Sequence, residues 1–451
     1  MKISENWLRT WVNPPVDSNT LSDQLTMLGL EVDDLSPAAK PFTGVVVGEV
    51  LTVEQHPDAD RLRVTTVNIG SGEPLQIVCG APNVRVGMKA PVATIGAVLP
   101  GDFKIKKGKL RGIESQGMLC GASEIDLEDK IDGLLELPVD APVGVDIREY
   151  LNLDDHVIDI SITPNRGDCF SIRGIAREIG VINQLTVTAP EINAVAATIA
   201  DEKKVVVSTE GCPRYLGRVI KNVNTKAATP EWMERALVRS GIRQHSILVD
   251  ITNYVLMELG QPLHAFDAAK IQGSVQVRQA NTAEKLVLLN EQEVELNEKV
   301  MVIADDEKAL AIAGIMGGLS SSVTDETQDI FLESAFFAPL AIAGRARSFG
   351  LHTDASQRYE RGVDFELPML AMHRASQLIA ELAGGEFGPI TTAEQTAVLP
   401  KREAIELEQV QVDQLLGYRV DAAFIADALS RLGCAVTVKA DGLWSVVPPS
   451  H

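Results

Sequence analysis

Glu333 is the residue whose surroundings most clearly call for a chemical partner. It lies in the segment Phe331-Leu-Glu-Ser-Ala-Phe-Phe337, with apolar side chains before and after it. An ionised carboxylate in apolar surroundings costs free energy unless it gains a hydrogen-bond donor or a cation. The sequence is compatible with two partners, a bound ligand or a structural ion pair with Arg345 or Arg347. The residue types alone favour the ion pair.

Two other segments crowd charged, hydroxyl and amide side chains against glycines and apolar flanks. Residues 241–267 contain His264, and residues 350–364 contain Thr353. Polar groups in such surroundings need partners, and a bound ligand is one such partner. His264 could position a water molecule. The alternative is a histidine satisfied inside the fold, with Asp267 as its partner.

Length and composition indicate a multidomain globular protein. A chain of 451 residues, 45% hydrophobic and 23% charged, predicts about three or four domains. It has no apolar run long enough to span a membrane. The five cysteines are odd in number and form no Cys-x-x-Cys pair, which predicts reduced thiols in the cytoplasm and no structural zinc.

The net charge of −21 does not favour a partner that carries phosphates, but charge is unevenly distributed. Residues 101–112 hold five basic side chains and one acid. An acidic body with a confined basic patch can still bind RNA, although a solvated hairpin explains this segment equally well. The basic residues are Lys104, Lys106, Lys107, Lys109 and Arg111.

Familiar catalytic motifs do not occur in the sequence. It contains no phosphate-binding loop, dinucleotide fingerprint, serine nucleophile elbow or His-Glu-x-x-His metal helix. We therefore assign no metal site and no synthetase ATP-binding site to this chain.

Hydrophobic patterning predicts an α+β multidomain protein. Helical spacing in residues 1–40 gives way to short β-runs punctuated by Gly and Pro, as expected of a small closed barrel over residues 41–149. A strand and a helix capped by Asp168 follow within residues 150–200. Residues 203–399 read as a large α+β block with buried strands.

The last segment, residues 401–451, is expected to be a small α/β unit. A helix begins after Asp421, and a hairpin turns at Asp441-Gly442. One helix and one hairpin bury too little surface to be stable alone. We therefore expect a truncated domain at this end.

Four motifs together resemble those of the bacterial phenylalanine–tRNA ligase beta subunit family, and the resemblance runs in order along the whole chain. It implies an N-terminal fragment: a discontinuous domain (1–40 with 150–200), an inserted tRNA-binding OB-fold (41–149), an editing domain (203–399) and the start of a further domain (401–451). The motifs are residues 241–267, residues 350–364, His56-Pro-Asp-Ala-Asp-Arg-Leu62 and Thr163-Pro-Asn-Arg-Gly-Asp168.

The resemblance implies that this part of the subunit hydrolyses Tyr-tRNA(Phe) after transfer and releases tyrosine. Aminoacylation, with ATP and Mg²⁺, would belong to the full enzyme, an expected α2β2 tetramer with the alpha subunit. The family's magnesium-linked acidic residues would follow His451, so no cofactor is expected here. The expected macromolecular partners are tRNA(Phe) and the alpha subunit, without DNA or membrane. A non-catalytic tRNA-binding scaffold is the alternative.

The resemblance also implies roles for particular residues. An apolar pocket rejects an added hydroxyl only by roughly a hundredfold, so fidelity requires a second site that recognises the tyrosine hydroxyl. Glu333 would bind that hydroxyl, His264 would orient water or the terminal ribose, and Thr353 would supply a hydrogen bond. The small residues Ala355 and Gly317 would leave room for the aromatic ring. Three arginines would hold the RNA 3′ end, with surface solvation as the alternative: Arg243, Arg345 and Arg347.

Overall fold

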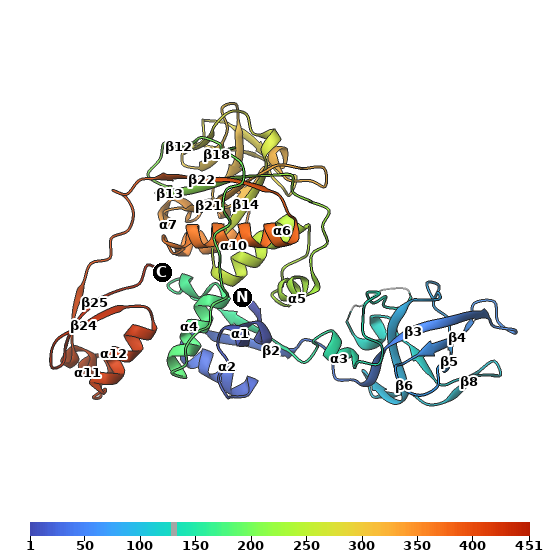
Figure 1. The fold of residues 1–451 in the computed structure, drawn as a ribbon. Helices are drawn as coiled ribbons and strands as arrows, with labels where there is room; N and C mark the ends of the chain where they lie inside the picture. Colours follow the sequence, from blue (N-terminus) through green and yellow to red (C-terminus); the bar gives the residue numbers. More distant parts are fainter. Residues whose placement is uncertain (128–132) are drawn as a thin grey trace. The chain divides into compact units, whose positions relative to one another are not determined.

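The structure, a computed structural model, describes residues 1–127 and 133–451. Its chain forms two compact units, one of residues 1–35 and 158–451 and the other of residues 36–157. Helices and several separate sheets occur along the chain (Figure 1), which confirms the α+β class. The finer division into four domains stays a prediction.

A three-stranded sheet with the order β1-β11-β2 joins residues from both ends of the first 200. Side-chain caps begin its helices, since Ser4 accepts a hydrogen bond from the amide of Trp7 and Asp17 accepts one from Thr20. The elements are β1 (Lys2–Ser4), α1 (Glu5–Trp11), α2 (Ser18–Met27), β2 (Glu31–Pro37), β11 (His156–Ser161) and α4 (Ile172–Ile182).

The predicted cap of α4 is wrong. Ser171, not Asp168, accepts a hydrogen bond from the amide of Gly174 and begins the helix. Asp168 lies in the preceding 3-10 turn (Gly167–Cys169), where Arg177 binds its carboxylate. The carboxylate of Asp168, which the sequence pattern assigns to the start of the helix, is therefore bound to the guanidinium of Arg177 instead.

The inserted unit contains a six-stranded sheet in which β10-β6-β3-β4-β5 are consecutive and β7 pairs with β6. No ladder closes it between β5 and β10 within the described residues, so the expected closed barrel is not formed. A single backbone hydrogen bond is found near this edge in the part of the chain that the structure describes: the amide of Gln116, which lies between β9 and β10, donates to the carbonyl of Gln76 in β5 at 2.8 Å. The elements are β3 (Thr43–Gln55), β4 (Arg63–Asn68), β5 (Leu75–Cys79), β6 (Lys89–Leu99), β7 (Phe103–Lys104), β8 (Gly108–Leu110), β9 (Ile113–Ser115), β10 (Gly117–Leu119) and α3 (Ile147–Tyr150).

The large block after residue 203 contains a four-stranded sheet, β14-β21-β13-β22, and a five-stranded sheet, β12-β15-β18-β19-β20. Helices α6 and α10 pack against the four-stranded sheet (Figure 1). The strands are β12 (Val205–Val207), β13 (Arg214–Lys221), β14 (Leu263–Asp267), β15 (Val275–Gln279), β18 (Met301–Ala304), β19 (Ala309–Ile312), β20 (Met316–Gly317), β21 (Ile330–Phe336) and β22 (Glu386–Glu394). A hairpin of β16 (Lys285–Val287) and β17 (Glu293–Glu295) and the helices α5 (Glu231–Arg239), α6 (Ile247–Leu259), α7 (Pro339–Ile342), α8 (Arg345–Ser348), α9 (Asp354–Arg361) and α10 (Leu367–Leu382) complete it.

Strand β21 separates two environments because successive side chains of a strand point to opposite faces. The Ser334 hydroxyl donates to the carbonyl of Pro368 in α10, so Ser334 marks the helix-covered face. Glu333 therefore points to the other face. Its antiparallel partners in register are His264 on β14 and Gly217 on β13, and such partners share a face.

Gly217 is required by this packing. A Cβ atom at this position would lie 2.1 Å from Cζ of Phe331, so the phenylalanine ring covers the strand where a side chain is missing. The ring therefore packs over the backbone of β13 at Gly217.

The C-terminal segment holds a sheet with the order β23-β25-β24 and a small core around Trp444. The predicted hairpin at Asp441-Gly442 is confirmed. Strand β23 and helix α11 enlarge the unit beyond the predicted helix and hairpin. The elements are β23 (Ile405–Glu408), α11 (Gln409–Leu416), α12 (Ala422–Arg431), β24 (Ala435–Ala440) and β25 (Leu443–Val447). Among the helices of residues 1–127 and 133–451, none is long and apolar enough to cross a membrane.

A buried ion pair joins the two helices that cover the four-stranded sheet. Arg374 of α10 donates to both carboxylate oxygens of Glu258 in α6, at 2.7 and 2.9 Å. We predict that Glu258→Met, which leaves the guanidinium unpaired, destabilises the chain by about 3–5 kcal/mol. The double substitution Glu258→Met with Arg374→Met should recover most of this loss. Denaturant unfolding followed by near-ultraviolet circular dichroism measures both, and equal losses in the single and double variants would contradict the prediction.

Candidate functional site

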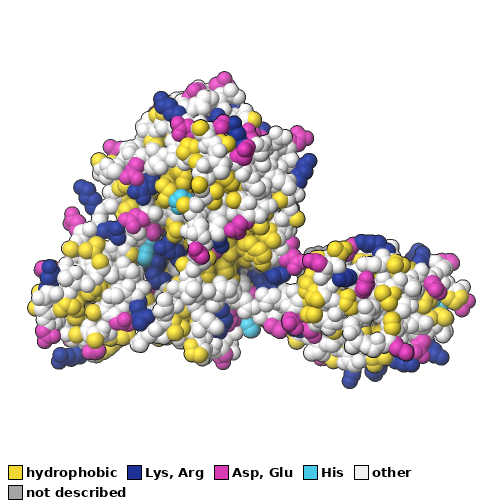
Figure 2. All heavy atoms as spheres, viewed as in Figure 1, with side chains coloured by type: hydrophobic (Ala, Val, Ile, Leu, Met, Phe, Trp, Pro, Cys, Tyr) yellow, Lys and Arg dark blue, Asp and Glu magenta, His cyan; other side chains and the backbone are white. Residues whose placement is uncertain are grey.

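A cavity of about 300 Å³ lies against the face of the four-stranded sheet that carries Glu333. This volume is at the lower end of the range for small-molecule sites. Residues of β14, β19, β20, β21 and α9 contribute to its wall, so both sheets of the large block build it. Hydrophobic side chains gather on the visible face of this block, with a histidine among them (Figure 2). The cavity brings together five residues predicted from the sequence: His264, Gly317, Glu333, Thr353 and Ala355.

Glu333 is 7% exposed and forms no ion pair with any described residue. The alternative that the residue types alone favour, a structural ion pair with Arg345 or Arg347, is therefore wrong. Its partner is Tyr215, whose hydroxyl donates to Oε2 at 2.9 Å. Burial raises the pKa of Glu333 to about 7, and the Tyr215 hydrogen bond opposes that rise.

His264 lies directly across the strand pair from Glu333. Its ring packs edge-on against Phe266, with the centroids 4.4 Å apart. Asp267 is not its partner, because that carboxylate accepts from Thr327 at 2.9 Å. The buried Nε2 atom of His264 has no hydrogen-bond partner among the described residues, and burial lowers the pKa of the ring to about 4. A neutral imidazole that lacks a protein partner at the wall of a cavity can orient a bound water or hydroxyl group.

Gly317 allows the imidazole to lie against the backbone of β20. A Cβ atom at this position would lie 2.5 Å from Cε1 of His264 and 2.8 Å from Nε2. Any side chain there would displace the histidine ring. The glycine therefore sets the position of His264 as well as leaving space in the cavity.

Thr353 and Ala355 bring the start of α9 to the cavity wall. Thr353 caps the helix, since its Oγ1 accepts from the amide of Ser356 at 3.0 Å and donates to the carbonyl of Ile315 at 2.9 Å. The hydroxyl proton is thus committed within the protein, which leaves the oxygen as an acceptor. Ala355 is half-buried in the first turn, where its methyl group limits the cavity.

The three predicted arginines do not line the cavity. Arg243 is exposed in the turn before α6, and Arg347 is exposed on α8. Arg345 is half-buried, and its Nε atom has no hydrogen-bond partner among the described residues. All three remain candidates for contacts outside the cavity.

The basic segment of the inserted unit lies beside a second hollow of about 660 Å³. Lys104 and Lys106 line it together with Phe103, whose side chain is 59% exposed. Lys107 pairs with Glu114 at 2.7 Å, and Arg111 donates to the carbonyl of Asp58 at 3.3 Å, whereas Lys109 is exposed. Exposed aromatic and basic side chains in one groove suit a nucleic acid, since bases stack and phosphates pair with cations.

Two tyrosines of the site were missed from the sequence. Tyr215 is fully buried behind Glu333, and Tyr359 lines the cavity with its hydroxyl 3.1 Å from the carbonyl of Ala335. Alternation along β13 places Tyr215 and Gly217 on one face. It does not reveal that this face meets a carboxylate 118 positions later.

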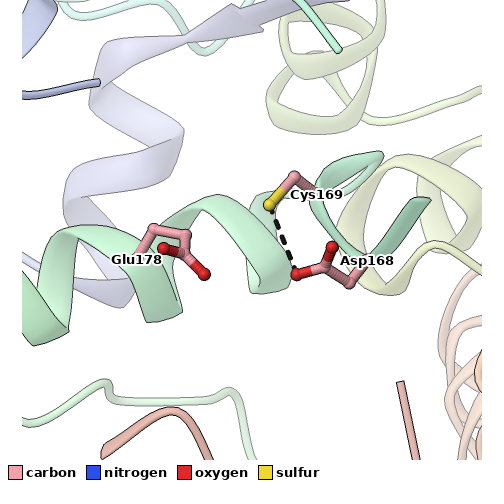
Figure 3. Close-up of side chains that lie close together, drawn as sticks. All are labelled: Asp168, Cys169 and Glu178. Atoms are coloured by element: carbon pink, nitrogen blue, oxygen red, sulfur yellow. Dashed lines mark hydrogen bonds between the residues drawn. The ribbon is translucent and has the colours of Figure 1, made fainter. Parts of the chain in front are cut away.

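Asp168, Cys169 and Glu178 form a separate polar cluster (Figure 3), with one potential ligand atom of each within 4.8 Å of the others. Arg166 occupies this cluster. Its Nη2 atom donates to Asp168 at 3.2 Å, to the Cys169 sulfur at 2.9 Å and to Glu178 at 2.6 Å. A guanidinium already supplies the positive charge that a metal ion would bring. The motif that begins at Thr163 is thus an ion-pair network that ties the turn to α4.

Comparison with known proteins gives two family matches. Residues 211–384 match the B3/4 domain, and residues 45–146 match a tRNA binding domain. The first range contains every residue that lines the cavity. A solved N-terminal fragment of the phenylalanyl-tRNA synthetase beta subunit from Pyrococcus horikoshii has a TM-score of 0.32 and 15% identity, and covers 66% of this chain and 82% of that one.

Related proteins match over the full length of this chain. The phenylalanine–tRNA ligase beta subunits of Acinetobacter baylyi and Psychrobacter arcticus are 80% and 60% identical to it. That of Pseudoalteromonas translucida is 56% identical. The chain spans 57% of the length of each of these relatives. Because matches of this identity extend over every residue of the chain, it belongs to the family of phenylalanine–tRNA ligase beta subunits.

Proposed function

We propose that this chain edits the product of a phenylalanine–tRNA ligase by hydrolysing Tyr-tRNA(Phe). The observation that supports the proposal is the environment of Glu333. A buried carboxylate without a cationic partner lines a cavity and uses one oxygen for Tyr215. Its second oxygen is a strong acceptor for the phenol that distinguishes tyrosine from phenylalanine. A site built to bind a hydroxyl discriminates against a ligand that lacks it far better than an apolar pocket does.

The hydrolysis itself requires little beyond orientation. Water adds to the ester carbonyl, the bond from that carbon to the terminal ribose oxygen breaks, and tyrosine and a free ribose hydroxyl leave. His264 is positioned to orient the water or the ribose, and Thr353 offers an acceptor oxygen nearby. Ala355 and Gly317 leave space for the aromatic ring.

The remaining roles concern the RNA and the full enzyme. We infer that residues 41–149 form an oligonucleotide-binding fold whose basic segment contacts tRNA(Phe), and that Arg243, Arg345 and Arg347 hold the RNA 3′ end. The tRNA binding domain match over residues 45–146 supports the first inference. Aminoacylation with ATP and Mg²⁺ would take place in the cytoplasm in a complex with the alpha subunit, and this chain would need no cofactor of its own.

One prediction of the proposed function concerns Glu333→Gln, which keeps the shape of the side chain and removes its charge. In the two-subunit enzyme, kcat/KM for hydrolysis of Tyr-tRNA(Phe) should fall by about 10- to 100-fold, the value of a lost hydrogen bond to a charged group. Release of labelled tyrosine from the purified ester measures it. Glu295→Gln, the same substitution at an exposed position on β17, is the matched control. Undiminished hydrolysis in Glu333→Gln would refute the site. A wild-type enzyme without hydrolysis would leave the non-catalytic tRNA-binding scaffold as the function.

Another prediction concerns the size of the cavity. Ala355→Trp should fill the space at the start of α9 and abolish hydrolysis of Tyr-tRNA(Phe), while phenylalanine transfer to tRNA continues. Leu340→Trp adds the same side chain at an 88% exposed position of α7 and should leave both activities unchanged. If Ala355→Trp retained hydrolysis, the ester would bind elsewhere.

A further inference from the structure

Tyr215 holds Glu333 from the side away from the cavity. Its side chain is fully buried and does not line the cavity, whereas Glu333 does. In the register of β13 and β21, Tyr215 is opposite Ala335 and Gly217 is opposite Glu333. The two side chains are thus diagonal neighbours on one face. Because Gly217 and Ala335 are small, the tyrosine hydroxyl can reach Oε2 at 2.9 Å.

The titratable groups around Glu333 bring no compensating positive charge. Burial and the nearby Glu333 charge raise the pKa of the Cys212 thiol, the Tyr215 hydroxyl and the Tyr359 hydroxyl well above their ordinary values. Burial lowers the pKa of His264 to about 4. All four groups are therefore neutral at neutral pH. The Tyr215 hydroxyl is the donor that stabilises an ionised Glu333 in the described structure.

We propose that Tyr215 is a positioning residue that binds Oε2 of Glu333, favours the ionised form of the carboxylate and leaves Oε1 to accept the hydroxyl of an incoming phenol. The inference rests on the proposed editing function. If that function holds, the carboxylate of Glu333 accepts hydrogen bonds from two phenol hydroxyls when a tyrosyl ester is bound, one from Tyr215 and one from the ligand. Each hydrogen bond favours the ionised form, so the protein tyrosine prepares the acceptor that the ligand uses.

The proposal has a consequence for pH dependence. Burial places the pKa of Glu333 at about 7, and the Tyr215 bond holds it below the value that burial alone would give. Removal of the hydroxyl should raise it further, so that a larger fraction of the carboxyl is protonated at neutral pH. A protonated carboxyl accepts a phenol less well, and hydrolysis should then require a higher pH.

Tyr215→Phe in the two-subunit enzyme tests this consequence. The acidic limb of the pH profile of kcat/KM for Tyr-tRNA(Phe) should move up by about one pH unit. Activity should be reduced about tenfold near pH 6.5 and approach the wild-type value near pH 8. Tyr418→Phe, at a 65% exposed position, is the matched control. A uniform loss of activity at every pH, or no change, would overturn the proposal, because a tyrosine that only fills space would not move the limb.

Two further measurements guard against a folding defect and against failure of the editing function. Site-specific 3,5-difluorotyrosine at position 215 keeps the ring and makes its hydroxyl a stronger donor, so it should move the limb to lower pH.

Infrared difference spectra, assigned with Glu333→Gln, report carboxyl protonation without any substrate. They should show more protonated Glu333 in Tyr215→Phe than in wild type at pH 7. An absent infrared difference would refute the role of Tyr215. A present one in an enzyme that does not hydrolyse Tyr-tRNA(Phe) would support the role of Tyr215 and refute editing.

Discussion

The site depends on a carboxylate that is removed from water without a cation to neutralise it. Burial of an unpaired charge costs several kcal/mol or more unless donors or protonation compensate. The same domain contains the opposite solution. Glu258, on a helix that covers the other face of the sheet, is bound at both oxygens by Arg374. Glu258 is saturated and has no capacity for a ligand, whereas Glu333 is only partly satisfied and keeps an acceptor for one.

Alternation along a single strand separates these two environments. Ser334 bonds to α10, and Glu333, the preceding residue, faces the cavity. A shift of one residue in the register of β21 would exchange the faces and bury the carboxylate against the helices. The partners of β21 on both sides therefore fix the chemistry as well as the fold. On one side β14 places His264 opposite Glu333, and on the other side β13 places Gly217, which has no side chain, opposite it.

The sequence predicts local features of this structure well. Helix α12 begins after Asp421, the hairpin turns at Asp441-Gly442, and the cavity contains five of the residues that the family resemblance indicates. It fails where distant residues compete for one group. Asp168 satisfies every local rule for a helix cap, yet arginines bind it and Ser171 caps the helix. The residue types around Glu333 favour a nearby arginine as its protein partner. The partner instead comes from a strand more than a hundred residues earlier, because strand pairing is set by the whole core and not by local spacing.

The inserted unit also has ends that meet. The amide of Ala38 donates to the carbonyl of Asp155 at 2.8 Å. The end of β2, where the inserted segment begins, therefore lies beside the start of β11, where that segment ends. Because its two ends are neighbours, an inserted unit of this kind can be attached to a sheet without separating the strands of that sheet. Evolution could lengthen, exchange or delete it while the host sheet kept its hydrogen bonds, and the binding surface it carries could diversify at a different rate from the cavity.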